Sequence, residues 1–124
     1  MKTENIKFKA KRLDNGEWVE GDLKHSTSYV GIGYPSSAFP DVPIVHRVNP
    51  SSVCMFTGMR DCKGKEIFEH DLIHFVGHKP IGEVIWSEED YAFMVAASEN
   101  EPLYLLPHVL EIGKIERVGN KFDK

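Results

Sequence analysis

The sequence predicts a mainly β protein built from many short strands. Apolar and polar residues alternate with a period of two in most short runs, which is typical of strands with one buried face. Glycine, asparagine, aspartate and proline separate these runs, as they do in turns. The seven prolines are spread along the chain and exclude a long helix where they fall. Short strands at regular spacing predict a small barrel or sandwich, and 124 residues are enough for a single domain with its own core.

The first predicted element is an N-terminal β-hairpin. Its first strand alternates apolar side chains with lysines over residues 6–11, so one face carries only lysine. Residues 14–16 are a tight-turn sequence, Asp-Asn-Gly, and an extended pattern resumes at residues 17–19. Two extended runs joined in this way predict an antiparallel pair.

A long loop is predicted at residues 25–43, within an N-terminal β region that covers residues 1–50. The loop is rich in serine, glycine and proline, and loops of this length in compact domains are usually functional or mobile. Residues 29–34 have the only strand-like pattern inside it. Residues 42–48 are predicted to be extended, and a short helix fits the sequence only at residues 50–55 or 105–110.

The second half of the chain has a more regular strand pattern. Residues 61–64 are predicted to form a turn in which Gly64 takes a positive φ. The polar residues 87–90 are expected to form a hairpin loop, and residues 119–124 a frayed tail. The predicted strands of this half are residues 66–69, 72–76, 81–86, 91–97 and 112–118, with a turn at 77–80.

Charge is divided unevenly along the chain. Residues 1–65 carry a net charge of +3 and residues 66–124 a net charge of −7, which together give the overall −4. The acidic half would repel phosphates, and neutralising phosphates supplies most non-specific affinity for nucleic acid. A protein partner is therefore expected ahead of nucleic acid, and the polarity permits head-to-tail self-association.

Composition predicts a cytoplasmic protein. No apolar run is long enough to span a bilayer, and the N-terminal residues lack the apolar stretch of a secretory signal. Cys54 and Cys62 are too few for a disulfide scaffold, and their spacing matches no common zinc motif. We expect two reduced thiols, one buried near Phe56 and one in a turn, and neither a membrane partner nor a cofactor.

The candidate binding face is the lysine face of the first strand. Its residues lie in the positively charged half of the chain, beside a predicted turn, and could contact an anionic partner. They are Lys7, Lys9, Lys11 and Arg12. The alternative interpretation is an edge strand whose lysines prevent aggregation.

His70, His74 and His78 recur every fourth residue and suggest a metal site if the segment is helical. The intervening apolar residues predict a strand instead, in which that spacing covers about 13 Å and is too long for one metal ion. Asp71 could act with His70 and His74 in a hydrolytic site. The alternative is that Asp71 caps the turn before the next strand through its side-chain oxygen.

Five aromatic residues could form a stacking surface for bases or a groove for a peptide. In a small β domain, aromatic side chains more often belong to the core, which is the interpretation favoured here. The five residues are Trp18, Tyr29, Tyr34, Trp86 and Tyr91.

The chain resembles the YopX-like proteins of phages and prophages in four places. The most specific is Phe-Thr-Gly-Met-Arg-Asp-Cys-Lys-Gly-Lys-Glu-Ile-Phe-Glu-His-Asp-Leu-Ile at residues 56–73. It is similar to the family pattern of Tyr or Phe followed by Thr-Gly-Leu-x-Asp-x-x-Gly-x-x-Ile-Tyr-Glu-Gly-Asp. The other matches lie at residues 6–11 with 16–21, at 82–86 with 92–93, and at 111–115. His70 stands where the family usually has glycine, so His70 must tolerate a positive φ if that glycine adopts one.

The resemblance implies a single YopX-like domain over residues 1–124, with an SH3-like barrel at residues 51–118. It also implies a phage or prophage accessory protein that self-assembles, and it supplies no chemistry. No nucleotide-binding or hydrolase motif is present in the sequence. We therefore predict a non-enzymatic, self-associating interaction module with a host or phage protein as partner. The alternative is a small metal-dependent hydrolase that uses His70, Asp71 and His74.

Overall fold

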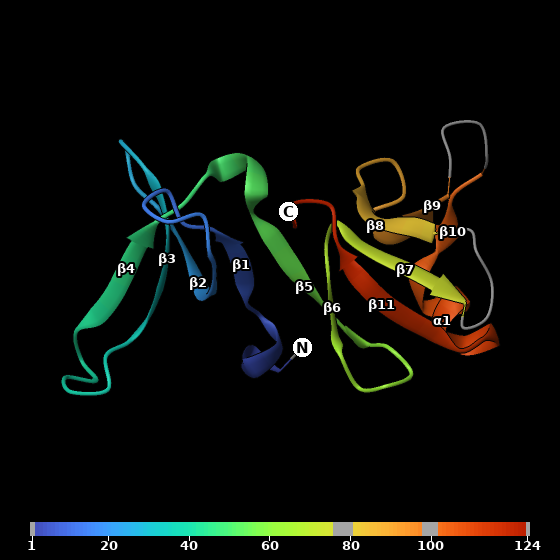
Figure 1. The fold of residues 1–124 in the computed structure, drawn as a ribbon, viewed down its shortest axis with the longest axis horizontal. Helices are drawn as coiled ribbons and strands as arrows, with labels where there is room; N and C mark the ends of the chain where they lie inside the picture. Colours follow the sequence, from blue (N-terminus) through green and yellow to red (C-terminus); the bar gives the residue numbers. More distant parts are fainter. Residues whose placement is uncertain (1, 76–80, 98–101, 124) are drawn as a thin grey trace. The chain divides into compact units, whose positions relative to one another are not determined.

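The computed structural model describes residues 2–75, 81–97 and 102–123. The chain divides into two compact units, Met1–Phe56 and Thr57–Lys124, which are described separately. Both units are built mainly from antiparallel strands, as the sequence predicts (Figure 1).

The first unit is a twisted antiparallel sheet with the strand order β4-β3-β2-β1-β5. A short 3-10 turn, η1, precedes the sheet at Thr3–Asn5, and another, η2 (Pro50–Ser52), precedes β5. Ala10, Ile32 and Val48 form the buried centre of this unit, with Phe8, Val19, Leu23, Val30 and Val53 packed around them. The strands are β1 (Phe8–Lys11), β2 (Trp18–His25), β3 (Val30–Pro35), β4 (Pro43–Arg47) and β5 (Cys54–Arg60), whose last residues belong to the second unit.

The predicted N-terminal hairpin is confirmed. β1 pairs antiparallel with β2, Lys11 opposite Trp18, and Gly16 supplies the positive φ of the connecting turn. The Asn15 side chain closes this turn by accepting the backbone N–H of Glu17 at 2.9 Å. Local turn chemistry therefore fixes the register of the first two strands.

The long loop predicted at residues 25–43 is largely replaced by strand. β2 continues to His25, and β3 occupies Val30–Pro35 between β2 and β4. Only residues 26–29 and 36–42 remain as connections. The glycines and serines that suggested a loop are accommodated because both long edges of β3 are hydrogen-bonded to neighbouring strands, which override local composition.

The second unit contains a five-stranded antiparallel sheet with the order β10-β9-β8-β7-β11. β6 (Glu66–Phe68) pairs with the end of β5, and the helix α1 (Leu106–Ile112) follows β10. Seven residues form the buried core of this unit: Ile67, Ile73, Val84, Val95, Leu106, Val109 and Ile115. The sheet strands are β7 (Asp71–Phe75), β8 (Ile81–Ser87), β9 (Ala92–Ala96), β10 (Tyr104–Leu105) and β11 (Ile115–Asn120).

Three further sequence expectations can be compared with the structure. The helices η2 and α1 overlap the two places where the sequence allowed one, whereas η1 lies outside them, and Pro107 stands in the first turn of α1. Strand β11 extends to Asn120, so residues 119–120 belong to the sheet and not to a tail. In the described residues neither sheet closes on itself, and the SH3-like barrel is therefore not confirmed. The predicted turn at residues 77–80 lies outside the described residues.

The two cysteines are free, as expected, with Cys54 buried and Cys62 exposed. Among the helices of the described residues, none has the length and apolar character needed to cross a membrane.

Candidate functional site

The predicted basic face lies on an interior strand. β1 pairs with β2 on one side and with β5 on the other, so the interpretation of β1 as a protected edge is wrong. Lys9 is only 7% exposed. A lysine that is buried in this way needs a local partner, because a desolvated charge is costly.

Aromatic rings receive the lysine side chains of β1. The ammonium groups of Lys9 and Lys11 lie 4.6 and 4.7 Å from the centroid of the Trp18 ring. Lys7 lies 5.0 Å from the Phe56 ring and 3.8 Å from a carboxylate oxygen of Glu20. Cation–π contacts of this kind stabilise desolvated ammonium groups. The predicted basic face is therefore a layer of lysines packed on aromatic rings.

Arg12 has a partner of a different kind. Its guanidinium forms two hydrogen bonds to the carboxylate of Asp14, at 2.9 and 2.6 Å. This hydrogen-bonded pair raises the pKa of Arg12, which is half-buried, and lowers the pKa of the exposed Asp14. The structure thus brings Lys9 and Lys11 together at Trp18 and gives Arg12 a separate place beside the first turn.

A pocket of about 190 Å³ opens on the first unit, over β2, β3 and the edge strand β4. We call it the proline pocket. Gly33 lies in its lining between the neighbouring strands, and a Cβ there would approach Val45 Cγ2 to 3.3 Å. Because Gly33 has no side chain, the floor of the pocket at this position is formed by the strand backbone. The lining residues are Asp22, Lys24, Gly33, Tyr34, Pro35, Pro40, Pro43 and Val45.

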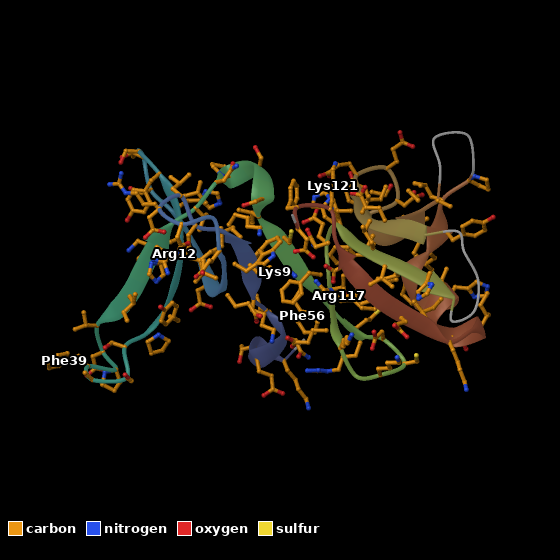
Figure 2. All side chains as sticks on the ribbon, in the orientation of Figure 1. Lys9, Arg12, Phe39, Phe56, Arg117 and Lys121 are labelled. Carbon is orange, nitrogen blue, oxygen red and sulfur yellow. The ribbon has the colours of Figure 1, made fainter. Side chains whose placement is uncertain are left out.

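The connection between β3 and β4 forms one edge of this pocket and carries exposed apolar side chains. Phe39 is 70% exposed and Val42 is 60% exposed. Figure 2 shows Phe39 at the tip of this connection, away from the strands. Neither residue was predicted from the sequence to belong to a site. The signal that was available is Phe-Pro-Asp-Val at residues 39–42, in which proline and aspartate are turn formers beside two apolar residues.

The carboxylate predicted as a turn cap, Asp71, is confirmed in that role. Asp71 is fully buried and accepts the backbone N–H of Phe68 at 2.7 Å. It also accepts hydrogen bonds from Arg117 Nε at 2.9 Å and from Asn120 Nδ2 at 2.8 Å. The carboxylate therefore connects the turn before β7 to the end of β11 through hydrogen bonds at both of its oxygens.

His70 is held beside this cluster by its ring and its backbone. Its φ is +69°, so His70 does adopt the conformation that a glycine would take at this position. Its Nδ1 lies 2.8 Å from Glu83 Oε2, and its ring packs edge-on against Phe122. In the described part of the chain, no three His, Cys, Asp or Glu side chains are placed to hold a metal ion. His78 lies outside the described residues.

Asp61 closes the outer edge of β11. Its Oδ1 accepts the backbone N–H groups of Lys63 and Lys65, both at 2.9 Å. Its Oδ2 accepts the backbone N–H of Arg117 at 2.8 Å, and Cys62 N–H bonds to Ile115 O. Burial acts to raise the pKa of Asp61, but the three N–H donors outweigh it and lower the pKa below its ordinary value.

Replacing Asp61 with asparagine should lower the free energy of unfolding by about 2 kcal/mol near neutral pH, because the amide has one acceptor oxygen and its NH2 group cannot accept the remaining backbone N–H. A lowered pKa means that the ionised carboxylate stabilises the fold above its unfolded pKa of roughly 4 and loses this effect as the pH falls through the folded pKa. The difference between the two proteins should therefore shrink in acid. Urea titrations at neutral and acidic pH measure it, and a gap that does not change with pH would contradict this role.

The five aromatic residues predicted for the core lie outside it. Tyr91 is 77% exposed, and Trp86 is 39% exposed with Phe93 against its ring. Tyr34 hydrogen-bonds through its hydroxyl to His46 Nε2 at 2.9 Å. Trp18 lies beside two lysines and Tyr29 beside Arg47, at 4.7 Å. Aliphatic side chains and the phenylalanines Phe56 and Phe68 are buried instead, which leaves these five rings to cover charged side chains or to face solvent.

No curated protein matches the chain. The family model described as YopX protein matches residues 2–124, which is essentially the whole chain. The match includes both sheets, the proline pocket and the carboxylates of the second unit. The chain belongs to the YopX family.

Proposed function

We propose that the protein is a non-enzymatic interaction module that self-associates and binds a further protein. The observation that carries this proposal is the exposure of large apolar side chains on the β3–β4 connection, where Phe39 and Val42 are 70% and 60% exposed. Apolar side chains that gather on a surface beside a pocket are typical of protein-binding sites. Membership of the YopX family suggests a phage-type protein, and a prophage accessory role is part of the proposal.

The arrangement of polar groups supports a binding role over a hydrolytic one. Asp71 has three hydrogen-bond donors, and the ring of His70 is bonded to Glu83. These groups stabilise the second unit, and no metal cluster accompanies them among the described residues. The lysine layer of β1 lies on Trp18 and Phe56, which favours a protein partner over the phosphates of a nucleic acid. The SH3-like barrel at residues 51–118 stays a prediction.

Size-exclusion chromatography with light scattering, in low salt and in roughly 1 M salt, tests the proposal. At high salt the Debye length is only about 3 Å, so contacts between exposed charges weaken while apolar contacts do not. We expect a defined oligomer that persists at high salt. An oligomer that dissociates in salt would assign assembly to the charge polarity of the chain instead. A monomer at every protein concentration would contradict self-association.

A further inference from the structure

We propose that the proline pocket binds the Phe39 side chain of a second copy of this chain, so that two copies exchange Phe39 side chains. This inference rests on the proposed self-association and names the contact that produces it. The observation behind it is an exposed aromatic ring on a hydrogen-bonded turn, next to a pocket of matching size on the same hairpin.

The backbone that carries Phe39 is held in place by its own turn. The N–H of Val42 donates to the carbonyl oxygen of Phe39 at 2.9 Å, which closes a β-turn with Pro40 at its second position. The hydroxyl oxygen of Ser36 accepts the N–H groups of Ala38 and Phe39, both at 3.3 Å. A turn that is braced on both sides presents the ring without much loss of conformational freedom on binding, and this favours association.

The pocket has the size and the surface that a phenyl ring requires. Its volume is about 190 Å³. An apolar protein cavity of roughly 150 Å³ is large enough to bind benzene. Pro35, Pro40, Pro43 and Val45 supply apolar walls, and Gly33 leaves the lining open between them. Phe39 of the same copy is not part of this lining and stays 70% exposed.

A second copy is the partner that best fits the arrangement. Ring and pocket lie on one hairpin, since Pro40 lines the pocket and directly follows Phe39. A twofold axis at this hairpin would form both contacts at once and close the assembly as a dimer. The pocket lining carries one cation, Lys24, and one anion, Asp22, and the exposed Asp41 is two residues beyond Phe39, so Lys24 is the group in the lining that an entering Asp41 could pair with.

Two single variants and their mixture test the exchange. Phe39→Ala removes the ring and keeps the pocket, whereas Lys24→Tyr keeps the ring and covers the pocket from an exposed strand position. Each variant loses both contacts of the symmetric dimer, and we expect a loss of about 100-fold in dimer affinity, on the order of tenfold for each contact. An equimolar mixture can form one intact contact and should associate about tenfold more tightly than either variant alone.

The assay is analytical ultracentrifugation, with circular dichroism to show that every variant keeps the fold. Ile112→Ala is the matched control, because it shortens a side chain that is 63% exposed in the second unit and should leave association unchanged. If the Phe39→Ala variant dimerises as tightly as the wild type, this inference is overturned and the proposed self-association stays intact. A mixture no tighter than its components would also overturn it. A monomeric wild type would overturn both.

Discussion

Replacing Asp71 with alanine should lower the free energy of unfolding of the second unit by about 3–5 kcal/mol, the usual effect of breaking a buried ion pair. The carboxylate is fully buried and accepts hydrogen bonds from Phe68 N–H, Arg117 Nε and Asn120 Nδ2. Alanine leaves all three donors without this acceptor, and the bonds from Phe68 N–H and Asn120 Nδ2 are buried. The Arg117 guanidinium also loses the carboxylate of Asp71. Its side chain is 23% exposed, so water can solvate part of the charge.

The measurement is a urea titration followed by tryptophan fluorescence. Each unit holds one tryptophan, so a Trp18→Phe background leaves Trp86 to report on the second unit. Glu89→Ala removes the same charge from an exposed loop and is the control, which should unfold as the parent does. Asp71→Asn should give an intermediate loss, because its amide group retains one acceptor. If Asp71→Ala unfolds with the midpoint of the control, the buried cluster does not stabilise this unit.

Replacing Gly21 with alanine should destabilise the first unit by about 3 kcal/mol, at the upper end of the usual range for overpacking. A Cβ at this position would overlap the backbone carbonyl oxygen of Gly33 and would come within 3.1 Å of Ile32 Cγ2. A flexible side chain can move aside at little cost, but a carbonyl in a hydrogen-bonded strand cannot. The close approach of β2 and β3 therefore requires glycine at position 21.

Gly33→Ala provides a graded comparison in the neighbouring pair of strands, β3 and β4. Its Cβ would lie 3.3 Å from Val45 Cγ2 and 3.4 Å from Ile44 O, so small shifts of the neighbours would relieve the contact. Urea titrations in a Trp86→Phe background, where Trp18 reports on the first unit, should give a clearly smaller loss for Gly33→Ala. Equal losses for the two variants would show that the β2–β3 approach is not the cause.

These structural roles explain the stretch that carries the family resemblance, residues 56–73. Thr57 donates its hydroxyl to Ile67 O at 2.7 Å, Asp61 accepts three backbone N–H groups, and Asp71 accepts three donors. Each of these polar side chains replaces a hydrogen bond that the short strands of the second unit cannot supply from their own backbone. The motif thus maintains a fold, which agrees with a protein whose function lies on its surface.

The features that could be predicted correctly from the sequence are those that depend on neighbouring residues. Alternation over residues 6–11 and the Asn15-Gly16 turn were enough for the N-terminal hairpin, and both are confirmed. The positions open to a helix, the turn with a positive φ at Gly64 and the capping role of Asp71 were also correct. Each depends on backbone sterics or on a hydrogen bond within three or four residues, and these act before any tertiary contact forms.

Contacts between residues that are far apart in the sequence depend on the tertiary structure and could not be predicted from local patterns. Arg117 and Asn120 reach Asp71 across 46 and 49 residues. The lysines of β1 lie inside the sheet because β5 pairs with the side of β1 opposite β2, and local alternation cannot distinguish an edge strand from an interior one. The proline pocket likewise combines β2, β3, β4 and their connection. Strand order sets such placements, and it is chosen by the packing and hydrogen bonding of the whole unit.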